Sequence, residues 1–119
     1  MSYAQKHTVT VTTATSGVGT GYTPVVTGRI AAVTYTKATG GLASTSDLTV
    51  TTEDSAQAVW SATNINATTT VHPLAPGNFA DGSASSLTEV PIFAAQERVK
   101  IAIAQGGNAK VGTFTVILA

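Results

Sequence analysis

Cysteine is absent from this chain of 119 residues, so neither disulfide bridges nor thiolate metal sites can contribute to its fold. Charged side chains make up only 10% of the sequence, against about 25% in a typical soluble domain. Six basic residues balance six acidic ones. Because phosphate binding requires several lysines or arginines on one face, the composition argues against a nucleic-acid partner. A surface with so few charges does little to keep copies apart, so we expect a protein that works in an assembled state.

Long apolar runs are also missing. None approaches the ~20 residues that a membrane-spanning helix needs, and residues 1–7 lack the apolar core of a signal peptide. We therefore expect a protein that is made in a cytoplasm and has no membrane partner.

Helical periodicity is absent, whereas strand-like alternation is common. In residues 98–103, valine and isoleucine alternate with charged or small residues, and residues 111–118 alternate in the same way. Successive side chains of a strand point to opposite faces, so each run has one apolar face. These faces hold Val99, Ile101 and Ile103 in the first run, and Phe114, Val116 and Leu118 in the second. The Gly-Gly-Asn sequence at 106–108 between them predicts a tight turn, and hence a hairpin that forms the central ribbon of the protein.

Several further segments are rich in threonine and valine, whose branched Cβ atoms favour strands. Seven or eight short strands separated by Gly, Pro and Asn turns predict an all-β protein with little or no helix. We expect a single-domain antiparallel β-sandwich over residues 7–119, for which jelly-roll connections are one option. Residues 1–6 are expected to form a flexible arm. Residues 74–89 lose the alternation and are expected to form a long surface loop.

The sequence offers no catalytic or metal-binding constellation. His7 and His72 are the two histidines, and no zinc-binding spacing surrounds either of them. Four carboxylates fall in predicted loops and turns: Asp47, Glu53, Asp54 and Asp81. We expect them to be solvated turn residues, and the alternative is that two of them bind a calcium ion. The glycines at 17, 19 and 21 precede neither a Lys-Ser/Thr pair nor a helix, so they do not form a phosphate loop. We expect a protein that is not an enzyme and that uses no cofactor and no metal.

Four segments resemble a group of small virion proteins of tailed bacteriophages and prophages. The first two are the Thr-Val-Thr-Val start at 8–11 and residues 22–30. The third joins Val59-Trp60 to residues 64–68, and the fourth joins residues 98–101 to 105–110. The resemblance extends from about His7 to Leu118, and its motifs are structural rather than catalytic.

The resemblance implies a structural protein on the capsid surface of a virion, made in the cytoplasm of a host bacterium. The expected function is that of a decoration, or cement, protein that binds the major capsid protein of the assembled shell and stabilises it. A homo-oligomer is expected, with a trimer preferred to a dimer because capsid lattices offer local threefold sites. Candidate contacts with the capsid or another partner are Ser2, Tyr3, Gln5, Lys6, Leu74 and Phe79.

Two other functions remain open. A tail or head–tail junction protein is the alternative within the virion. A carbohydrate-binding module is the alternative from a different class. Such modules present exposed aromatic rings as a stacking platform, and the seven aromatic residues of this chain leave few after the core is filled.

Overall fold

The alternating runs fold into strands in the computed structural model, which describes residues 4–119 apart from the side chain of Ser86. Eleven strands and no helix occur within these residues, so no helix there could cross a membrane. The strands are β1 (Gln5–Thr12), β2 (Gly19–Tyr22), β3 (Val26–Thr36), β4 (Asp47–Thr52), β5 (Ala58–Ala62), β6 (Thr69–Val71), β7 (Leu74–Asn78), β8 (Ala84–Pro91), β9 (Phe93–Glu97), β10 (Val99–Ala104) and β11 (Val111–Leu118).

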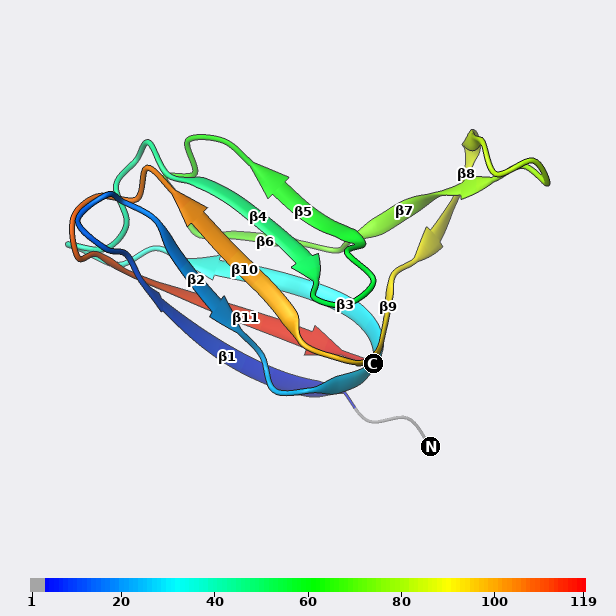
Figure 1. The fold of residues 1–119 in the computed structure, drawn as a ribbon, viewed down its shortest axis with the longest axis horizontal. Helices are drawn as coiled ribbons and strands as arrows, with labels where there is room; N and C mark the ends of the chain where they lie inside the picture. The colour runs from blue at the N-terminus through cyan, green and yellow to red at the C-terminus, as the bar shows by residue number, and fades with distance from the viewer. Residues whose placement is uncertain (1–3) are drawn as a thin grey trace.

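Eight of these strands build a two-layer sandwich (Figure 1). One layer has the order β1-β11-β3-β6, with β9 paired to the first part of β3, and the other has the order β2-β10-β4-β5. Strands β7, β8 and β9 are not among these eight, so β10 and β11 are the seventh and eighth strands of the sandwich in chain order. With this numbering the two layers have the strand orders 1-8-3-6 and 2-7-4-5. This is the jelly-roll arrangement, in which the chain changes layer at almost every connection. The predicted antiparallel β-sandwich is therefore confirmed, and its connections are those of a jelly roll.

The core lies between the two layers, where the apolar face of each strand points inward. The face of β10 predicted from the sequence is buried, since Val99, Ile101 and Ile103 are at most 1% exposed. The predicted face of β11 is buried as well, and its Phe114 ring lies 5.2 Å from the ring of Tyr35 on β3. Period-two alternation therefore decides which side chains fill the sandwich.

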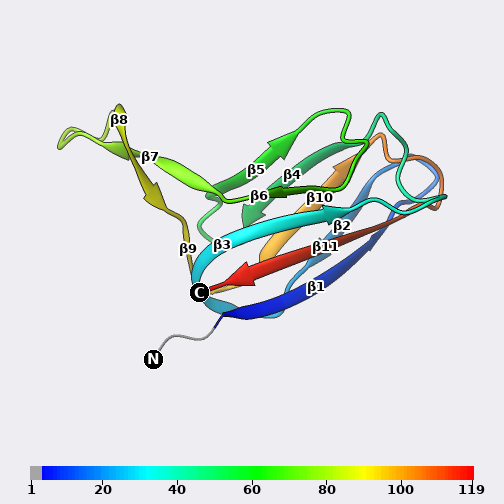
Figure 2. The same cartoon turned by 180° about the vertical axis from the view of Figure 1, so that it is seen from behind.

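The predicted hairpin of residues 98–118 is wrong. β10 pairs with β2 and β4, whereas β11 pairs with β1 and β3, so the two strands lie in opposite layers (Figure 2). The turn between them does reverse the chain, helped by Gln105 and Gly107 at positive φ. It carries the chain across the core, so the apolar faces of β10 and β11 meet each other instead of lying side by side on one sheet.

The predicted flexible arm at residues 1–6 is wrong for its last two residues. Gln5 and Lys6 belong to β1 and pair with Leu118 and Ile117 of β11. A paired backbone is held by the ladder of inter-strand hydrogen bonds, so the sandwich begins before His7. Residues 1–3 lie outside the described part of the chain.

The predicted long loop at residues 74–89 is a two-stranded hairpin, made of β7 and β8, that projects from one end of the sandwich (Figure 1). Leu74 pairs with Pro91 at its root. The projection stretches the molecule to 45 Å along its longest axis. The radius of gyration is 14.8 Å, against about 13.5 Å for a compact domain of this length. This hairpin is the feature of the fold that most needs a functional explanation.

Candidate functional site

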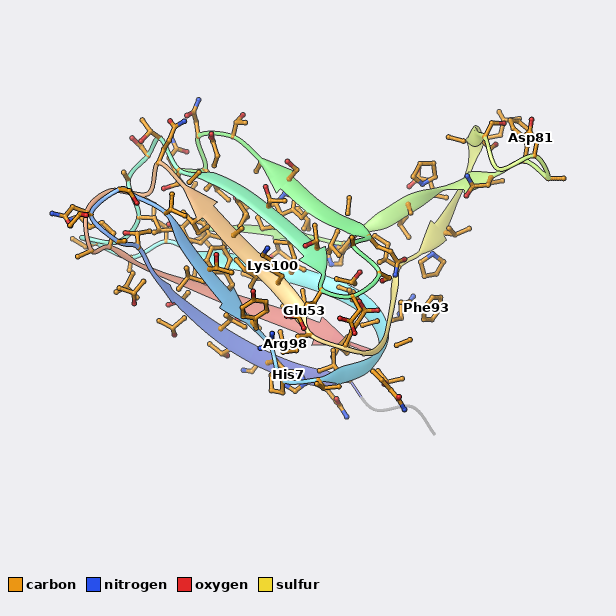
Figure 3. The ribbon with its side chains drawn as sticks, in the orientation of Figure 1. His7, Glu53, Asp81, Phe93, Arg98 and Lys100 are labelled. Atoms are coloured by element: carbon orange, nitrogen blue, oxygen red, sulfur yellow. The ribbon has the colours of Figure 1, made fainter. Side chains whose placement is uncertain are left out.

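The two histidines belong to different parts of the fold. His7 lies half-buried on β1 (Figure 3), and His72 lies exposed on the link between β6 and β7. Over residues 4–119 the structure contains no group of three or more side chains that could hold a metal ion.

Asp47 and Glu53, two of the four carboxylates considered for a calcium pair, accept hydrogen bonds that hold the fold. Asp47 Oδ1 accepts a hydrogen bond of 3.2 Å from the backbone N–H of Asn64. Glu53 forms a two-pronged ion pair with Arg98, whose Nε donates at 2.9 Å and whose Nη2 binds the other carboxylate oxygen. This hydrogen bonding lowers the pKa of Glu53 and raises that of Arg98. The guanidinium also covers the ring of Tyr22, at 3.9 Å from the centroid, so that ring is not a free stacking surface.

Glu97 is a buried acid that the sequence analysis did not single out. It is 5% exposed and accepts hydrogen bonds of 3.0 Å from the backbone N–H groups of Asp54 and Ser55, and of 3.4 Å from that of Ala95. The Ser55 hydroxyl binds both of its oxygens. The Ser55 backbone bond contributes most to holding the pKa of Glu97 below its ordinary value. Gln96 takes a φ of 52° beside it. Glu97 thus fastens the β4–β5 turn to β9, which is a structural role.

The projecting hairpin ends in an ordered turn. The Phe79 N–H donates to the Ser83 carbonyl and the Gly82 N–H to the Phe79 carbonyl, both at 2.9 Å. Gly82 has a φ of 90°, the left-handed conformation that closes a type I turn followed by a bulge. Asp81 Oδ1 accepts from the N–H and hydroxyl of Ser83, at 3.0 and 2.7 Å, and these bonds lower its pKa. The tip therefore presents an aromatic ring and a carboxylate from a fixed backbone.

Apolar side chains are exposed along this hairpin and on the strand that follows it. The largest exposed fraction is 85%, at Leu87 on β8. We call these residues the hairpin surface: Leu74, Phe79, Leu87, Val90 and Phe93. Figure 3 shows Asp81 at the far end of the hairpin and Phe93 at the outer side of the strand near its root. A group of large apolar side chains on a projecting element marks a site of interaction with another molecule.

Prolines restrict how this surface can bind. Pro76 on β7 and Pro91 on β8 lack the backbone N–H that a further strand would need as a donor. Both strands pair only with each other within the described residues, so their outer edges are open. Proline on an open edge discourages strand addition. We therefore expect the hairpin surface to bind through side chains.

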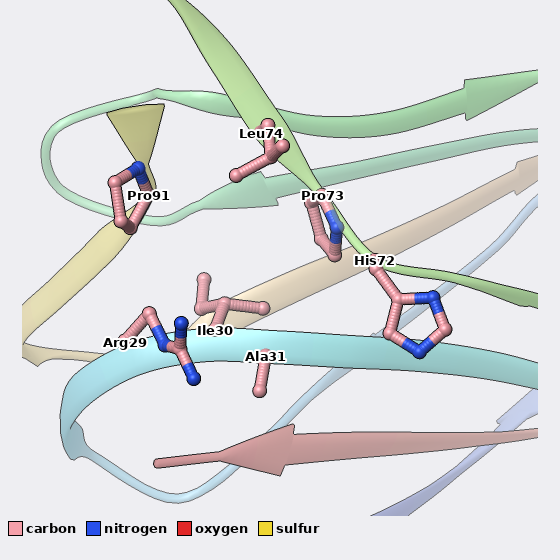
Figure 4. Close-up of a pocket in the computed structure, with 7 residues that line it drawn as sticks. All are labelled: Arg29, Ile30, Ala31, His72, Pro73, Leu74 and Pro91. Carbon is pink, nitrogen blue, oxygen red and sulfur yellow. The ribbon is translucent and has the colours of Figure 1, made fainter. Parts of the chain in front are cut away.

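A hollow of about 280 Å³ lies where the hairpin joins the sandwich (Figure 4). β3 supplies one wall, and the β6–β7 link and the ends of the hairpin supply the others. We call it the root hollow; its lining residues are Arg29, Ile30, Ala31, His72, Pro73, Leu74 and Pro91. It combines apolar walls with a guanidinium and an imidazole.

Comparison with known proteins gives little guidance on function. No protein-family model matches the chain, and no curated protein matches it. Among solved structures, the crystal structure of FlhE is similar over 98% of each chain, with 11% sequence identity and a TM-score of 0.47.

The candidate contacts chosen from the sequence are not all in one place. Leu74 and Phe79 lie on the hairpin surface, 54% and 55% exposed. Gln5 and Lys6 are exposed on β1 but engaged in its backbone ladder, and Ser2 and Tyr3 lie outside the described residues.

The exposed side chains of β8 and β9 and the residues of the root hollow are functional candidates that the sequence patterns do not predict. A signal for the hairpin was present, because an Asp-Gly pair between two strand-like runs favours a tight turn. Nothing in the local sequence brings Arg29 and His72 to the same hollow, because β3 and the β6–β7 link meet only in the folded chain.

Proposed function

We propose that this protein is a non-enzymatic structural component of a tailed-phage virion that decorates the outside of the assembled capsid and stabilises it. It acts as a homo-oligomer, and its partner is the major capsid protein. The observation that carries the proposal is the projecting hairpin with its exposed apolar side chains. The jelly-roll sandwich supports it, since this architecture recurs among viral capsid domains. The resemblance of the sequence to phage virion proteins supports it independently.

The energetics of the hairpin favour a surface that is covered in the working state. A two-stranded hairpin is marginal in water by itself, and this one joins the sandwich only at its root. Burying one leucine or phenylalanine side chain is worth about 1.5–3 kcal/mol. The five residues of the hairpin surface are 42% to 85% exposed, together equal to about three fully exposed side chains, so their burial offers roughly 4–9 kcal/mol before the cost of losing translational and rotational freedom is subtracted. One copy alone would therefore bind weakly, and attachment at several capsid subunits raises the affinity.

Stabilisation of the shell follows from where the protein binds. A ligand that binds only the assembled state stabilises that state by mass action. An oligomer that contacts several capsid subunits gains further from multivalent attachment. The sandwich acts as the rigid body in this scheme, and the hairpin makes the contact.

The arrangement of the aromatic side chains favours this reading over a carbohydrate-binding module. The exposed rings are Phe79 on the hairpin tip, Phe93 on β9 and Tyr22 on β2, where Arg98 covers the ring. Among the described residues, only Phe79 and Phe93 therefore present an exposed ring that is not covered by another side chain, which is few for a stacking platform. A tail or head–tail junction protein would bind its partner through the same hairpin surface. The pull-down below distinguishes these locations from the capsid.

The test is a pull-down with purified, undecorated capsids. Wild-type protein is expected to sediment with the capsids, whereas the double variant Leu87→Ser/Phe93→Ser is expected to remain in the supernatant. Val18→Ser is the matched control, because Val18 is 53% exposed on the β1–β2 turn and lies outside the hairpin surface. Equal binding by the wild type and the double variant would contradict attachment through the hairpin. Absence of wild-type binding would contradict the capsid location and favour the tail.

A further inference from the structure

The two ends of the hairpin are chemically complementary. At its root, the hollow is lined by three apolar residues that are at least partly exposed, Ala31, Leu74 and Pro91, and by Arg29 and His72, which carry a cationic and an ionisable group (Figure 4). At its tip, the hairpin presents an exposed aromatic ring and a carboxylate two residues apart. An apolar group flanked by a negative charge is what the hollow is suited to receive.

The dimensions agree with this match. An apolar cavity of about 150 Å³ holds a benzene ring. The root hollow, at about 280 Å³, is large enough for the ring of Phe79. Three hydrogen bonds with Ser83 fix the backbone at Phe79 and the carboxylate of Asp81, so little backbone freedom is lost on docking.

A tip cannot reach the hollow of its own chain. β7 is an extended strand of five residues, which separates root from tip by about 17 Å. Backbone pairing with β8 keeps it extended. The occupant of the hollow must therefore come from another molecule, and a second copy of this chain carries the matching group.

We propose that the hairpin tip of each copy inserts into the root hollow of a neighbouring copy, with Phe79 between the apolar walls and Asp81 beside Arg29. Tip and hollow are different surfaces, so the contact is head-to-tail, and it forms a closed ring where the rotation between neighbouring copies allows closure. In a three-membered ring every tip fills a hollow and no hollow is left empty. The same holds for a dimer in which each copy inserts its tip into the hollow of the other. The choice of three rests on the proposed function, because capsid lattices offer local threefold sites. The contact itself requires no capsid.

The first test is sedimentation velocity of the full-length protein without capsids. The wild type is expected to form a closed oligomer, and Phe79→Ser is expected to raise its dissociation constant by about tenfold or more, as for a central aromatic anchor. Val18→Ser again serves as the matched control and should assemble normally. A wild type that stays monomeric at every concentration would overturn the proposal, as would normal assembly of Phe79→Ser.

The second test is a charge exchange. Asp81→Lys and Arg29→Glu should each weaken assembly, and the chain carrying both should assemble again because the pair is restored with reversed signs. Asp81→Asn keeps an oxygen to accept the Ser83 bonds, so it should weaken assembly while the turn remains intact. If the doubly substituted chain assembles no better than either single variant, then Asp81 does not contact Arg29 and the proposal fails.

Mixing the two single variants determines the size of the ring. In a reciprocal dimer of one Asp81→Lys copy and one Arg29→Glu copy, both contacts pair opposite charges, so assembly is fully restored. In a three-membered ring at least one contact joins two copies of the same variant, so assembly is restored only in part. No recovery in the mixture would overturn the contact.

These measurements separate the contact between copies from capsid attachment. If Phe79→Ser is monomeric but still sediments with capsids, then the proposed function holds and the ring is not required for it. If the wild type forms the ring but does not bind capsids, then the contact between copies holds and the capsid location fails.

Discussion

The hydroxyl group of Tyr35 provides a sharp test of the core. Tyr35 lies on β3, is 1% exposed and packs against Phe114, and its hydroxyl has no hydrogen-bond partner among the described residues. A buried polar group without a partner costs about 1–3 kcal/mol of desolvation. Tyr35→Phe removes that cost and keeps the ring. The void left by one oxygen atom, ~12 Å³, costs only about 0.3 kcal/mol.

We therefore expect Tyr35→Phe to increase the free energy of unfolding by about 1–2 kcal/mol. For a chain of this length, each kcal/mol raises Tm by roughly 3–6 °C. Urea unfolding at one fixed protein concentration measures the change, because assembly makes stability depend on concentration. Tyr22→Phe makes the same chemical change at an exposed ring and should alter stability by less than about 0.5 kcal/mol.

The same substitution should change the response to alkaline pH. Burial raises the pKa of Tyr35 above its ordinary value, so the folded state retains the proton when the unfolded state loses it. The stability that depends on this proton is present below the unfolded value of about 10 and declines as the pH rises above it. Tyr35→Phe should flatten that decline. A loss of stability in Tyr35→Phe at neutral pH would mean that the hydroxyl has a partner, and would refute the reasoning.

Two further predictions concern the sandwich. The lowered pKa of Glu97 implies stability that is present above the unfolded value of about 4.3 and is lost as the pH falls through the folded value. Glu97→Gln should therefore unfold more readily at pH 7, and its urea midpoint should change less on acidification; an acid response equal to the wild type's would contradict the role of Glu97. Phe114→Ala should cost about 3–5 kcal/mol in urea unfolding, because its side chain is fully buried, whereas Thr115→Ala should cost much less. Equal losses at the two positions would mean that the inward face is misassigned.

Much of the fold could be predicted from alternation alone. Alternation predicts that Ile101 and Phe114 face inward, and both are buried. Alternation specifies which face of a strand is apolar, but it does not specify which strand lies alongside. Two strands that face each other across a core show the same alternation as two strands paired in one sheet. The pattern of β10 and β11 therefore predicts a hairpin that the fold does not contain. Only the pairing with distant strands, such as Ile101 opposite Val50, separates the two possibilities.

The candidate site was harder to predict, because exposure is a property of the folded chain. Leu87 lies on β8 and is exposed because that strand extends beyond the sandwich, which no local pattern indicates. Pro76 and Gly77 in β7 made the segment look like a loop, since both residues are unfavourable in the interior of a sheet. An isolated hairpin tolerates them. Gly77 even packs closely, because a Cβ atom there would lie 2.2 Å from Oγ1 of Thr88.

The direct pairing of Leu74 with Pro91 means that the chain leaves the sandwich and returns to it at nearly the same point. A segment attached in this way can vary in sequence and length while its ends stay fixed. The residues that choose a partner are thereby separated from those that keep the sandwich folded. Natural substitutions in the hairpin could change the surface that such a protein binds while its core residues stay the same. By the same reasoning, residues 75–90 could be exchanged for the recognition hairpin of another binding protein.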